Sequence, residues 1–272
     1  MRGGRLLIGV VIAIFSIISY YASREDNPIT GEKQAVGMSQ DQELALGQEA
    51  APQMAREFGG LDPDPALQAF VDEVGNKLVQ SSDARKTDWK FEFSLLGDAK
   101  TVNAFALPGG PIFITKALLA RMTDEAQLAG VLGHEIGHVV ARHAAEQAAK
   151  TQLGQGLVGA VAVGTSDGSG VGGGQLAQFV AQMTMMKYGR EDELQSDSLG
   201  VRFMADAGYD PRALIDVMDI LADASGGQPR GPEFSSTHPD PGNRKAVIEN
   251  AIRERYPNGV QGVTRGRTIG RN

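Results

Sequence analysis

The chain has 272 residues, 42% of them hydrophobic and 22% charged, so it is long enough to bury a core and too apolar to be disordered throughout. Its formal net charge of -7 is opposite to the balance of a general nucleic-acid binder, so no nucleic-acid partner is expected. The chain has no cysteine, which excludes disulfides, thiolate metal sites and a cysteine nucleophile. It has only four histidines, so their spacing is informative.

The amino terminus has the pattern of a membrane-targeting segment. Arg2 and Arg5 precede a hydrophobic run from Leu6 to Tyr21, and polar residues follow. Because Tyr21-Ala22-Ser23 places a large side chain where a cleavage site needs a small one, we expect residues 1–23 to be an uncleaved anchor. The charges on either side predict a cytoplasmic amino terminus; in a bacterium, the chain would be anchored in the inner membrane and face the periplasm. Secretion to the periplasm after signal cleavage is the alternative.

The rest of the chain is predicted to be a linker, one domain and a tail. Residues 24–38 are polar, contain proline and glycine, and are interpreted as the linker. Residues 39–258 show helical patterns, then short strands between residues 89 and 115, then more helices. This order predicts an α+β fold that is mainly helical with a small β-sheet. Residues 259–272 are expected to be a flexible tail.

Two long helices are expected in the second half of the domain, over residues 123–150 and 175–207. A glycine-rich segment, residues 154–174, separates them. It lacks the spacing of a phosphate-binding loop and is too short to span a membrane. A mobile apolar flap beside the functional site and a plain flexible linker both remain open for this segment.

Residues 134–138 read His-Glu-Ile-Gly-His within helical sequence. On an α-helix, positions i and i+4 share one face, so both imidazoles can bind the same metal ion. Glu135 is turned by about 100° from His134, where it can reach a metal-bound water without being a ligand. A metal that lowers the pKa of its water and a carboxylate that takes the proton are the two requirements of metal-assisted hydrolysis. The motif therefore predicts a hydrolytic metal site.

Two glycines lie in the same predicted helix, although each weakens a helix by about 1 kcal/mol relative to alanine. They are Gly133 and Gly137. Close approach of a bound group to the helix would explain them. Tight packing against another helix would explain them equally well.

A third ligand has to come from outside this motif. On a continuous helix His143 would point away from both His134 and His138, so it is not expected to bind the metal. The metzincin spacing is excluded because residues 141 and 144 are both alanine.

A glutamate from a second helix is the other known arrangement, and the segment from Glu193 to Asp197 has the ExxxD spacing. Glu193 is then the expected ligand. Asp197, one turn later, is expected to accept a hydrogen bond from a ligand imidazole and so fix its tautomer. The neighbouring carboxylates of Glu191 and Asp192 remain alternatives.

Four ordered stretches resemble the M48 family of zinc metallopeptidases, within the gluzincins. They are NAFALPGG at residues 103–110, HEIGHVVARH at 134–143, YGREDELQSD at 188–197 and STHPDPGNR at 236–244. The resemblance covers roughly residues 38–256. It implies a zincin-like metalloprotease domain with one zinc ion per chain, bound by His134, His138 and Glu193, and with Glu135 as the general base.

The first and last stretches contain further candidate residues. A predicted strand with a free edge can hydrogen-bond an extended substrate, and an ordinary sheet strand is the alternative. The candidate substrate-binding residues are Asn103, Ala104, Phe105 and Ala106. His238 is a candidate catalytic residue that donates to the oxyanion of the tetrahedral intermediate or binds zinc as a resting fourth ligand; an exposed loop histidine is the alternative.

Three other residues in these stretches have less specific expected roles. Arg244 is expected to support either the same developing charge or the fold. Tyr188 and Arg190 are expected to be packing and salt-bridge residues.

The predicted function is zinc-dependent endoproteolysis of unfolded or damaged envelope proteins, with polypeptides as substrates and the membrane as a partner through the amino-terminal segment. The single apolar segment, and the absence of a helical-repeat domain after the last predicted helix, favour the short, single-anchor, envelope-facing branch of the family. The substrate class follows from this analogy alone. A chaperone or assembly factor that binds unfolded chains, with latent proteolysis, is the alternative. A metal-binding module without hydrolysis is less favoured, because Glu135 would then have no role.

Overall fold

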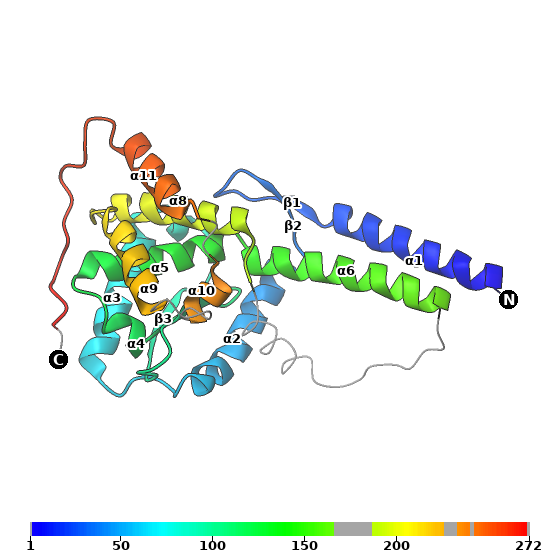
Figure 1. Ribbon diagram of the computed structural model, residues 1–272, viewed down its shortest axis with the longest axis horizontal. Helices are drawn as coiled ribbons and strands as arrows, with labels where there is room; N and C mark the ends of the chain where they lie inside the picture. Colours follow the sequence, from blue (N-terminus) through cyan, green and yellow to red (C-terminus); the bar gives the residue numbers. More distant parts are fainter. Residues whose placement is uncertain (1, 166–186, 226–232, 240–241, 271–272) are drawn as a thin grey trace.

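The computed structural model describes residues 2–165, 187–225, 233–239 and 242–270. Two helices, α1 (Arg2–Ala22) and α6 (His143–Thr165), lie side by side and project from a rounded body, with the amino terminus at the far end (Figure 1). The body holds a small sheet and the helices α2 (Gln40–Glu57), α3 (Pro65–Ser81), α4 (Lys116–Leu119), α5 (Glu125–Val140), α8 (Arg190–Asp206), α9 (Ala213–Ser225), α10 (Glu233–Thr237) and α11 (Arg244–Arg255), with a 3-10 turn, η1 (Asp83–Lys86). The expected mainly helical fold with a small sheet is confirmed.

The amino-terminal helix is present, but the membrane span is not confirmed. The hydrophobic run from Leu6 to Tyr21 lies within α1. Among the described residues, no helix has both the length and the apolar character that crossing a membrane requires.

Residues 24–38, where the sequence predicted a linker, contain an antiparallel hairpin of β1 (Arg24–Asp26) and β2 (Lys33–Ala35). The hairpin is attached to the body through two buried amide side chains. Asn27 Nδ2 donates to Gln34 Oε1 over 2.7 Å and to the carbonyl oxygen of Val140 over 2.8 Å. Gln34 Nε2 donates to the carbonyl oxygen of Ala141. These bonds satisfy carbonyls at the carboxyl end of α5, which have no partner within the helix.

The three-stranded sheet is centred on β5 (Pro111–Thr115), whose five residues are all buried. This strand pairs in parallel with β3 (Glu92–Leu96) and in antiparallel fashion with β4 (Ala104–Ala106). The turn from β4 to β5 requires Gly110, because its φ is 129° and an added Cβ would lie 2.3 Å from the carbonyl oxygen of Lys90. The strand β4 is thereby left at the edge of the sheet, next to α5.

The helix predicted over residues 123–150 is two helices, because the chain turns sharply at Arg142. This residue has a φ of 56°, in the left-handed region that a side chain rarely adopts. Its guanidinium is held by three partners: Nε donates to Glu43 Oε1 over 2.8 Å, Nη1 to Glu25 Oε2 over 2.7 Å, and Nη2 to the carbonyl oxygen of Met38 over 3.0 Å. These contacts offset the backbone strain and direct α6 away from the axis of α5.

The other predicted long helix is also shorter than expected. Residues 187–189 are not helical, and α8 begins at Arg190. The earlier part of that prediction, residues 175–186, lies outside the described residues. Of the glycine-rich segment, residues 154–165 belong to α6, and residues 166–174 lie outside the described residues.

The carboxy-terminal segment, predicted to be a flexible tail, is bonded along the start of α5. The backbone N–H groups of Glu125 and Ala126 donate to the carbonyl oxygens of Arg267 and Arg265 over 2.8 and 3.0 Å. Arg267 Nε also donates to Glu125 Oε2 over 2.7 Å. Two first-turn donors of α5 are therefore satisfied by residues more than a hundred positions away in the sequence.

Candidate metal centre

The predicted metal-binding motif lies on the most enclosed helix of the body. Every residue of α5 is buried, including His134, Glu135 and His138. The helical placement that the spacing predicted is confirmed. All polar groups of this helix must therefore be satisfied by the protein or by a bound ligand.

Small residues bring α8 against α5 at very short range. A Cβ added to Gly137 would lie 3.1 Å from the Cα of Ser196, and one added to Gly200 would lie 3.2 Å from the backbone nitrogen of His134. Of the two explanations for Gly133 and Gly137, tight helix packing is the one that the structure shows. This packing brings the ExxxD segment of α8 within reach of the two histidines.

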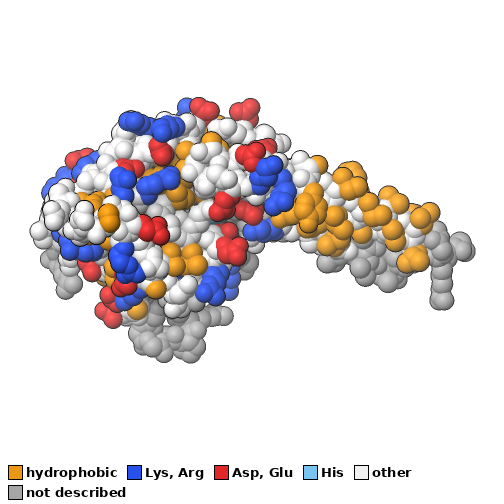
Figure 2. Space-filling view, turned by 90° about the horizontal axis from the view of Figure 1, so that it is seen from above, with side chains coloured by type: hydrophobic (Ala, Val, Ile, Leu, Met, Phe, Trp, Pro, Cys, Tyr) orange, Lys and Arg blue, Asp and Glu red, His pale blue; other side chains and the backbone are white. Residues whose placement is uncertain are grey.

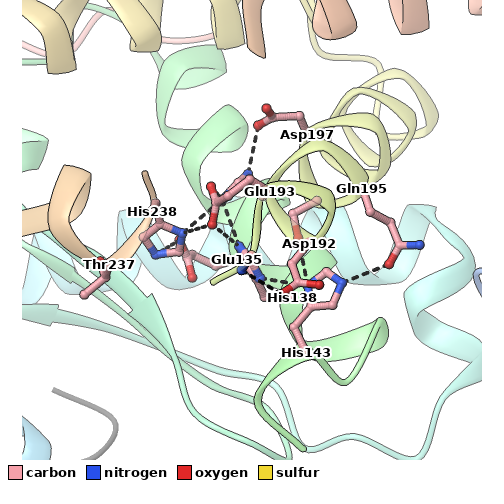
Figure 3. A network of polar contacts seen from close by, with 12 residues as sticks. Glu135, His138, His143, Asp192, Glu193, Gln195, Asp197, Thr237 and His238 are labelled. Carbon is pink, nitrogen blue, oxygen red and sulfur yellow. Dashed lines mark hydrogen bonds and ion pairs between the residues drawn. The ribbon is translucent and has the colours of Figure 1, made fainter. Parts of the chain in front are cut away.

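Four side chains converge in the interior between α5, α8 and the residue that follows α10: His134, His138, Glu193 and His238. Figure 3 shows His138, Glu193 and His238 of this cluster. Each offers one ligand atom, and these atoms all lie within 4.8 Å of one another. The Nε2 atoms of His134 and His138 are 3.0 Å apart. Glu193 Oε2 lies 3.5 Å from His134 Nε2, and Glu193 Oε1 lies 3.5 Å from His138 Nε2. Two imidazoles, one carboxylate and a further imidazole form a donor set that suits zinc.

The charges around His134 favour a cation at this point. Its Nδ1 lies 3.0 Å from Asp197 Oδ1, which is the contact predicted for Asp197. Burial by itself lowers the pKa of His134, but hydrogen bonds to Asp197 and Glu193 outweigh it and raise this pKa to about 9. The pKa of Glu193 lies well below its ordinary value, because the surrounding histidines outweigh the effect of burial. The same negative potential that holds a proton on His134 attracts a metal cation.

Glu135 lies beside this cluster without contributing a ligand atom to it. Among the described residues, neither of its carboxylate oxygens has a hydrogen-bond partner, and neither has Nε2 of His238. Glu135 Oε1 and His238 Nε2 are 3.6 Å apart, which is too far for a direct hydrogen bond. Burial raises the pKa of Glu135 above its ordinary value. An unpaired, buried carboxylate next to a cation-binding cluster is suited to act as a base.

Arg244 connects the two carboxylates of α8. Its Nε donates to Asp197 Oδ2 over 2.8 Å and its Nη2 to Asp197 Oδ1 over 2.7 Å, while Nη1 lies 3.1 Å from Glu193 Oε2. All three side chains are buried. Of the two roles expected for Arg244, its position favours orienting the acidic residues rather than contacting a substrate.

His143 corrects the sequence-based prediction. Because the helix breaks at Arg142, His143 does not point away: its Nδ1 lies 2.8 Å from Nδ1 of His138. Its Nε2 lies 2.9 Å from Gln195 Oε1 on α8. Burial lowers the pKa of both His138 and His143. Gln195 was not among the candidate residues predicted from the sequence, although it lies within the ExxxD segment.

A sequence model of peptidase family M48 matches residues 65–252. The chain belongs to this family. It is 31% identical to the beta-barrel assembly-enhancing protease of Yersinia pestis, over 85% of the chain and 48% of that protein. It is 30% identical to the mitochondrial metalloendopeptidase OMA1 of Schizosaccharomyces pombe, over 87% of the chain and 69% of that protein.

The human mitochondrial metalloendopeptidase OMA1 is 28% identical over 91% of the chain and 50% of its own length. The chain spans about half the length of the bacterial relatives that it matches. The family and the names of these relatives support a metalloendopeptidase.

The remaining candidates of the M48 signature occupy distinct places. Glu191 is exposed, and Asp192 accepts a hydrogen bond from the backbone N–H of Gly189 over 2.8 Å, so neither competes with Glu193 as a ligand. The ring of Tyr188 stacks on His138 with 3.9 Å between centroids, as expected of a packing residue. Arg190 is exposed, and no ion pair among the described residues includes it.

The predicted substrate-binding strand lies at the edge of the sheet. Residues Ala104–Ala106 form β4, and Asn103 immediately precedes it. The side chains of Ala104 and Ala106 are buried, whereas Phe105 is half-buried and stacks on Phe113 of β5 with centroids 5.0 Å apart. β5 occupies one side of β4, so the other side is the edge that an extended peptide would pair with.

Proposed function

We propose that this M48 protein is a zinc-dependent metalloendopeptidase that hydrolyses peptide bonds of unfolded or damaged envelope proteins. The observation that carries this proposal is the buried cluster of His134, His138, Glu193 and His238, with the unpartnered carboxylate of Glu135 beside it. His134, His138 and Glu193 would bind one zinc ion per chain. When bound, zinc supplies a Lewis acid that polarises the substrate carbonyl and makes water more acidic.

The protein's own residues would move the proton. Glu135 would accept a proton from the attacking water and return it to the leaving amine, and burial raises its pKa above the ordinary value, which favours accepting a proton. His238 has Nδ1 facing Glu193 at 3.0 Å and Nε2 facing Glu135 at 3.6 Å. These contacts support two roles for His238: it would donate to the developing oxyanion, or it would bind zinc as a fourth ligand at rest.

The edge of β4 would align the substrate. Backbone pairing along residues 103–106 would bind an extended peptide with little dependence on its sequence, which suits unfolded chains as substrates. The names of the bacterial relatives refer to β-barrel assembly, and this supports a substrate of the cell envelope.

The helix α1 would associate with the inner membrane and leave the catalytic domain in the periplasm, or it would be removed as a signal after secretion. Figure 2 shows hydrophobic side chains gathered along the projecting part of the molecule. Those of α1 include Leu6, Leu7, Val11, Phe15 and Ile18, all more than half exposed. An exposed row of this kind is typical of a surface that contacts lipid or another protein.

The test measures zinc content and casein cleavage by the full chain. Glu135→Gln is compared with Glu191→Gln, which changes an exposed carboxylate near the same site. All three proteins are expected to bind one zinc ion, and only Glu135→Gln is expected to lose cleavage, by about 10²- to 10⁴-fold. Cleavage at an unchanged rate by Glu135→Gln, or a parent protein without stoichiometric zinc, would contradict the proposal. A chaperone would keep its biological effect in Glu135→Gln, whereas a protease would lose it.

A further inference from the structure

A chain of three side chains runs from the metal cluster through the first residue of α6 to α8. It starts at His138, passes through His143 and ends at Gln195 (Figure 3). The two Nδ1 atoms are 2.8 Å apart, and His143 Nε2 lies 2.9 Å from Gln195 Oε1. His138 and His143 are both buried, with 2% and 1% of their surface exposed. Water is therefore not available to satisfy these ring nitrogens.

The direction of each hydrogen bond follows from the chemistry of the atoms. An amide oxygen only accepts, so His143 carries its proton on Nε2 and donates it to Gln195. In a neutral imidazole the other nitrogen is then an acceptor, so His143 Nδ1 accepts from the Nδ1–H of His138. With its proton on Nδ1, His138 presents an unprotonated Nε2 to the cluster. That nitrogen has the lone pair that a metal ion requires.

We propose that Gln195 and His143 are positioning residues that fix the tautomer of His138, so that its Nε2 lone pair faces the metal. This inference rests on the proposed zinc site. Metal-bound histidines usually donate their second N–H to a carboxylate, a backbone carbonyl or water. Here a second imidazole takes that place, and Gln195 sets its tautomer in turn.

The two ligand histidines of α5 are thus oriented by different groups. His134 is paired with the ionised carboxylate of Asp197, which Arg244 also contacts. His138 is paired with a neutral ring, which adds no further negative charge to a site that already holds Glu193 and Asp197. An additional buried carboxylate would raise the electrostatic cost of the metal-free protein.

The fold makes this arrangement possible through the break at Arg142. On a continuous helix, His143 would project from the opposite side of α5 from His134. The left-handed backbone of Arg142 redirects the chain, and the bonds of its side chain to Glu43, Glu25 and Met38 hold that turn. The strained residue therefore has an identifiable purpose: it brings His143 back beside His138.

Nuclear magnetic resonance of the zinc-loaded full chain, labelled with ¹⁵N in histidine, tests the tautomers directly. The chain has four histidines, so the ring nitrogens give few signals. The expected result is a protonated Nδ1 in His138, an unprotonated Nδ1 and a protonated Nε2 in His143, and a scalar coupling across the bond between the two Nδ1 atoms. A protonated Nδ1 in His143, or an Nδ1 of His138 without a proton, would overturn the inference.

Two variants test these hydrogen bonds through zinc affinity, measured by competition with a chromophoric chelator at one neutral pH. Gln195→Met removes the accepting oxygen and keeps the approximate shape of the side chain. Gln127→Met is the matched control, because Gln127 is a glutamine of α5 whose side-chain oxygen also accepts a hydrogen bond, from the backbone N–H of Thr123 over 2.7 Å.

Zinc affinity is expected to fall by about 10- to 100-fold in Gln195→Met and to stay within about threefold in Gln127→Met. Equal zinc affinity in Gln195→Met and the control would contradict the proposal that Gln195 and His143 fix the tautomer of His138. If Gln195→Met does not fold, the labelled parent protein still decides the tautomers. Failure of the parent to bind zinc would instead refute the proposed function, so the two failures are distinguishable.

Discussion

The closest approach of α5 and α8 provides the sharpest test of how the fold positions the metal ligands. In Gly137→Ala, the new methyl group would lie 3.1 Å from the Cα of Ser196 and 3.2 Å from its carbonyl oxygen. Carbon atoms in ordinary contact are about 3.5–4.0 Å apart, so the two helices have to separate by about half an ångström. Gly137 directly precedes His138, and Glu193 lies one turn before Ser196. Separating the two helices would therefore increase the distance between the candidate ligands His138 and Glu193.

Two opposing effects set the expected size of the change. Replacing glycine by alanine inside a helix stabilises it by about 1 kcal/mol, and overpacking costs about 1–3 kcal/mol. The metal-free protein should therefore lose between about 0 and 2 kcal/mol of unfolding free energy. Metal sites tolerate ligand displacements of only about 0.2 Å, so zinc affinity should fall by about tenfold or more, which is about 1.4 kcal/mol.

Gly133→Ala is the matched control, one turn earlier on the same face. Its added methyl would lie 3.4 Å from the carbonyl oxygen of Gly200, an ordinary contact. This variant should gain up to about 1 kcal/mol of stability and keep its zinc affinity within about threefold. Thermal unfolding of chelator-treated protein and zinc competition measure the two quantities. The reasoning is wrong if Gly137→Ala is as stable as Gly133→Ala and binds zinc equally tightly.

Two further predictions concern charges buried around α5 and α8. Arg244→Ala removes the guanidinium from two buried carboxylates and should lower the unfolding free energy by about 3–5 kcal/mol. Lys245→Ala is the control: it breaks an exposed ion pair with Asp219 and should change the unfolding free energy by less than about 1 kcal/mol. Denaturant titrations measure both values. Burial alone would raise the pKa of Glu125, but bonds from Arg267 and Tyr209 outweigh it and lower this pKa to about 2. The stability that Glu125 contributes, at most about 3 kcal/mol, is present above an unfolded pKa near 4.5 and is lost as the pH falls towards 2. Glu125→Gln should therefore be less stable than the parent at neutral pH, and the difference should shrink over that acidic range; a difference independent of pH would contradict this assignment.

The sequence was most informative where one helix carries the pattern. The spacing of His134 and His138 places both rings on one face whatever the tertiary structure, because the helical period alone decides it. The expectation for Glu193 came from the known ExxxD arrangement, because nothing in the spacing within α8 says which helix it packs against. Gly133 and Gly137 indicated that another group lies close to this helix without identifying that group. In the structure the neighbour is α8.

The position of His143 was mispredicted for a physical reason. The residues around it are good helix formers with no proline or glycine between Val139 and Lys150, so the local sequence predicts an uninterrupted helix. The break at Arg142 is imposed by Glu43 and Glu25, which are about a hundred residues away in the chain. Tertiary contacts of this kind override local propensity and leave no local signal.

The two ends of the chain make contacts that their local sequence does not indicate, for a related reason. Residues 24–38 and 259–272 are polar and rich in glycine or proline, which locally favours a linker and a tail. Their hydrogen-bonding groups are nevertheless used by α5: Asn27 and Gln34 bond to carbonyls at its carboxyl end, and the backbone of Arg265 and Arg267 accepts from its first turn.

A helix that is buried along its whole length explains why both ends of the chain return to it. The end groups of an exposed helix are satisfied by water, whereas unpaired groups at the ends of a buried helix cost about 1–3 kcal/mol each. The burial of α5 fits the proposed metal site, because such a site needs rigid ligands that are shielded from competing water. Because water cannot reach these ends, polar segments distant in sequence provide the hydrogen-bonding groups that cap α5. The hairpin of β1 and β2 and the carboxy-terminal segment around Arg265 and Arg267 are therefore part of the structure that holds His134, Glu135 and His138 in place.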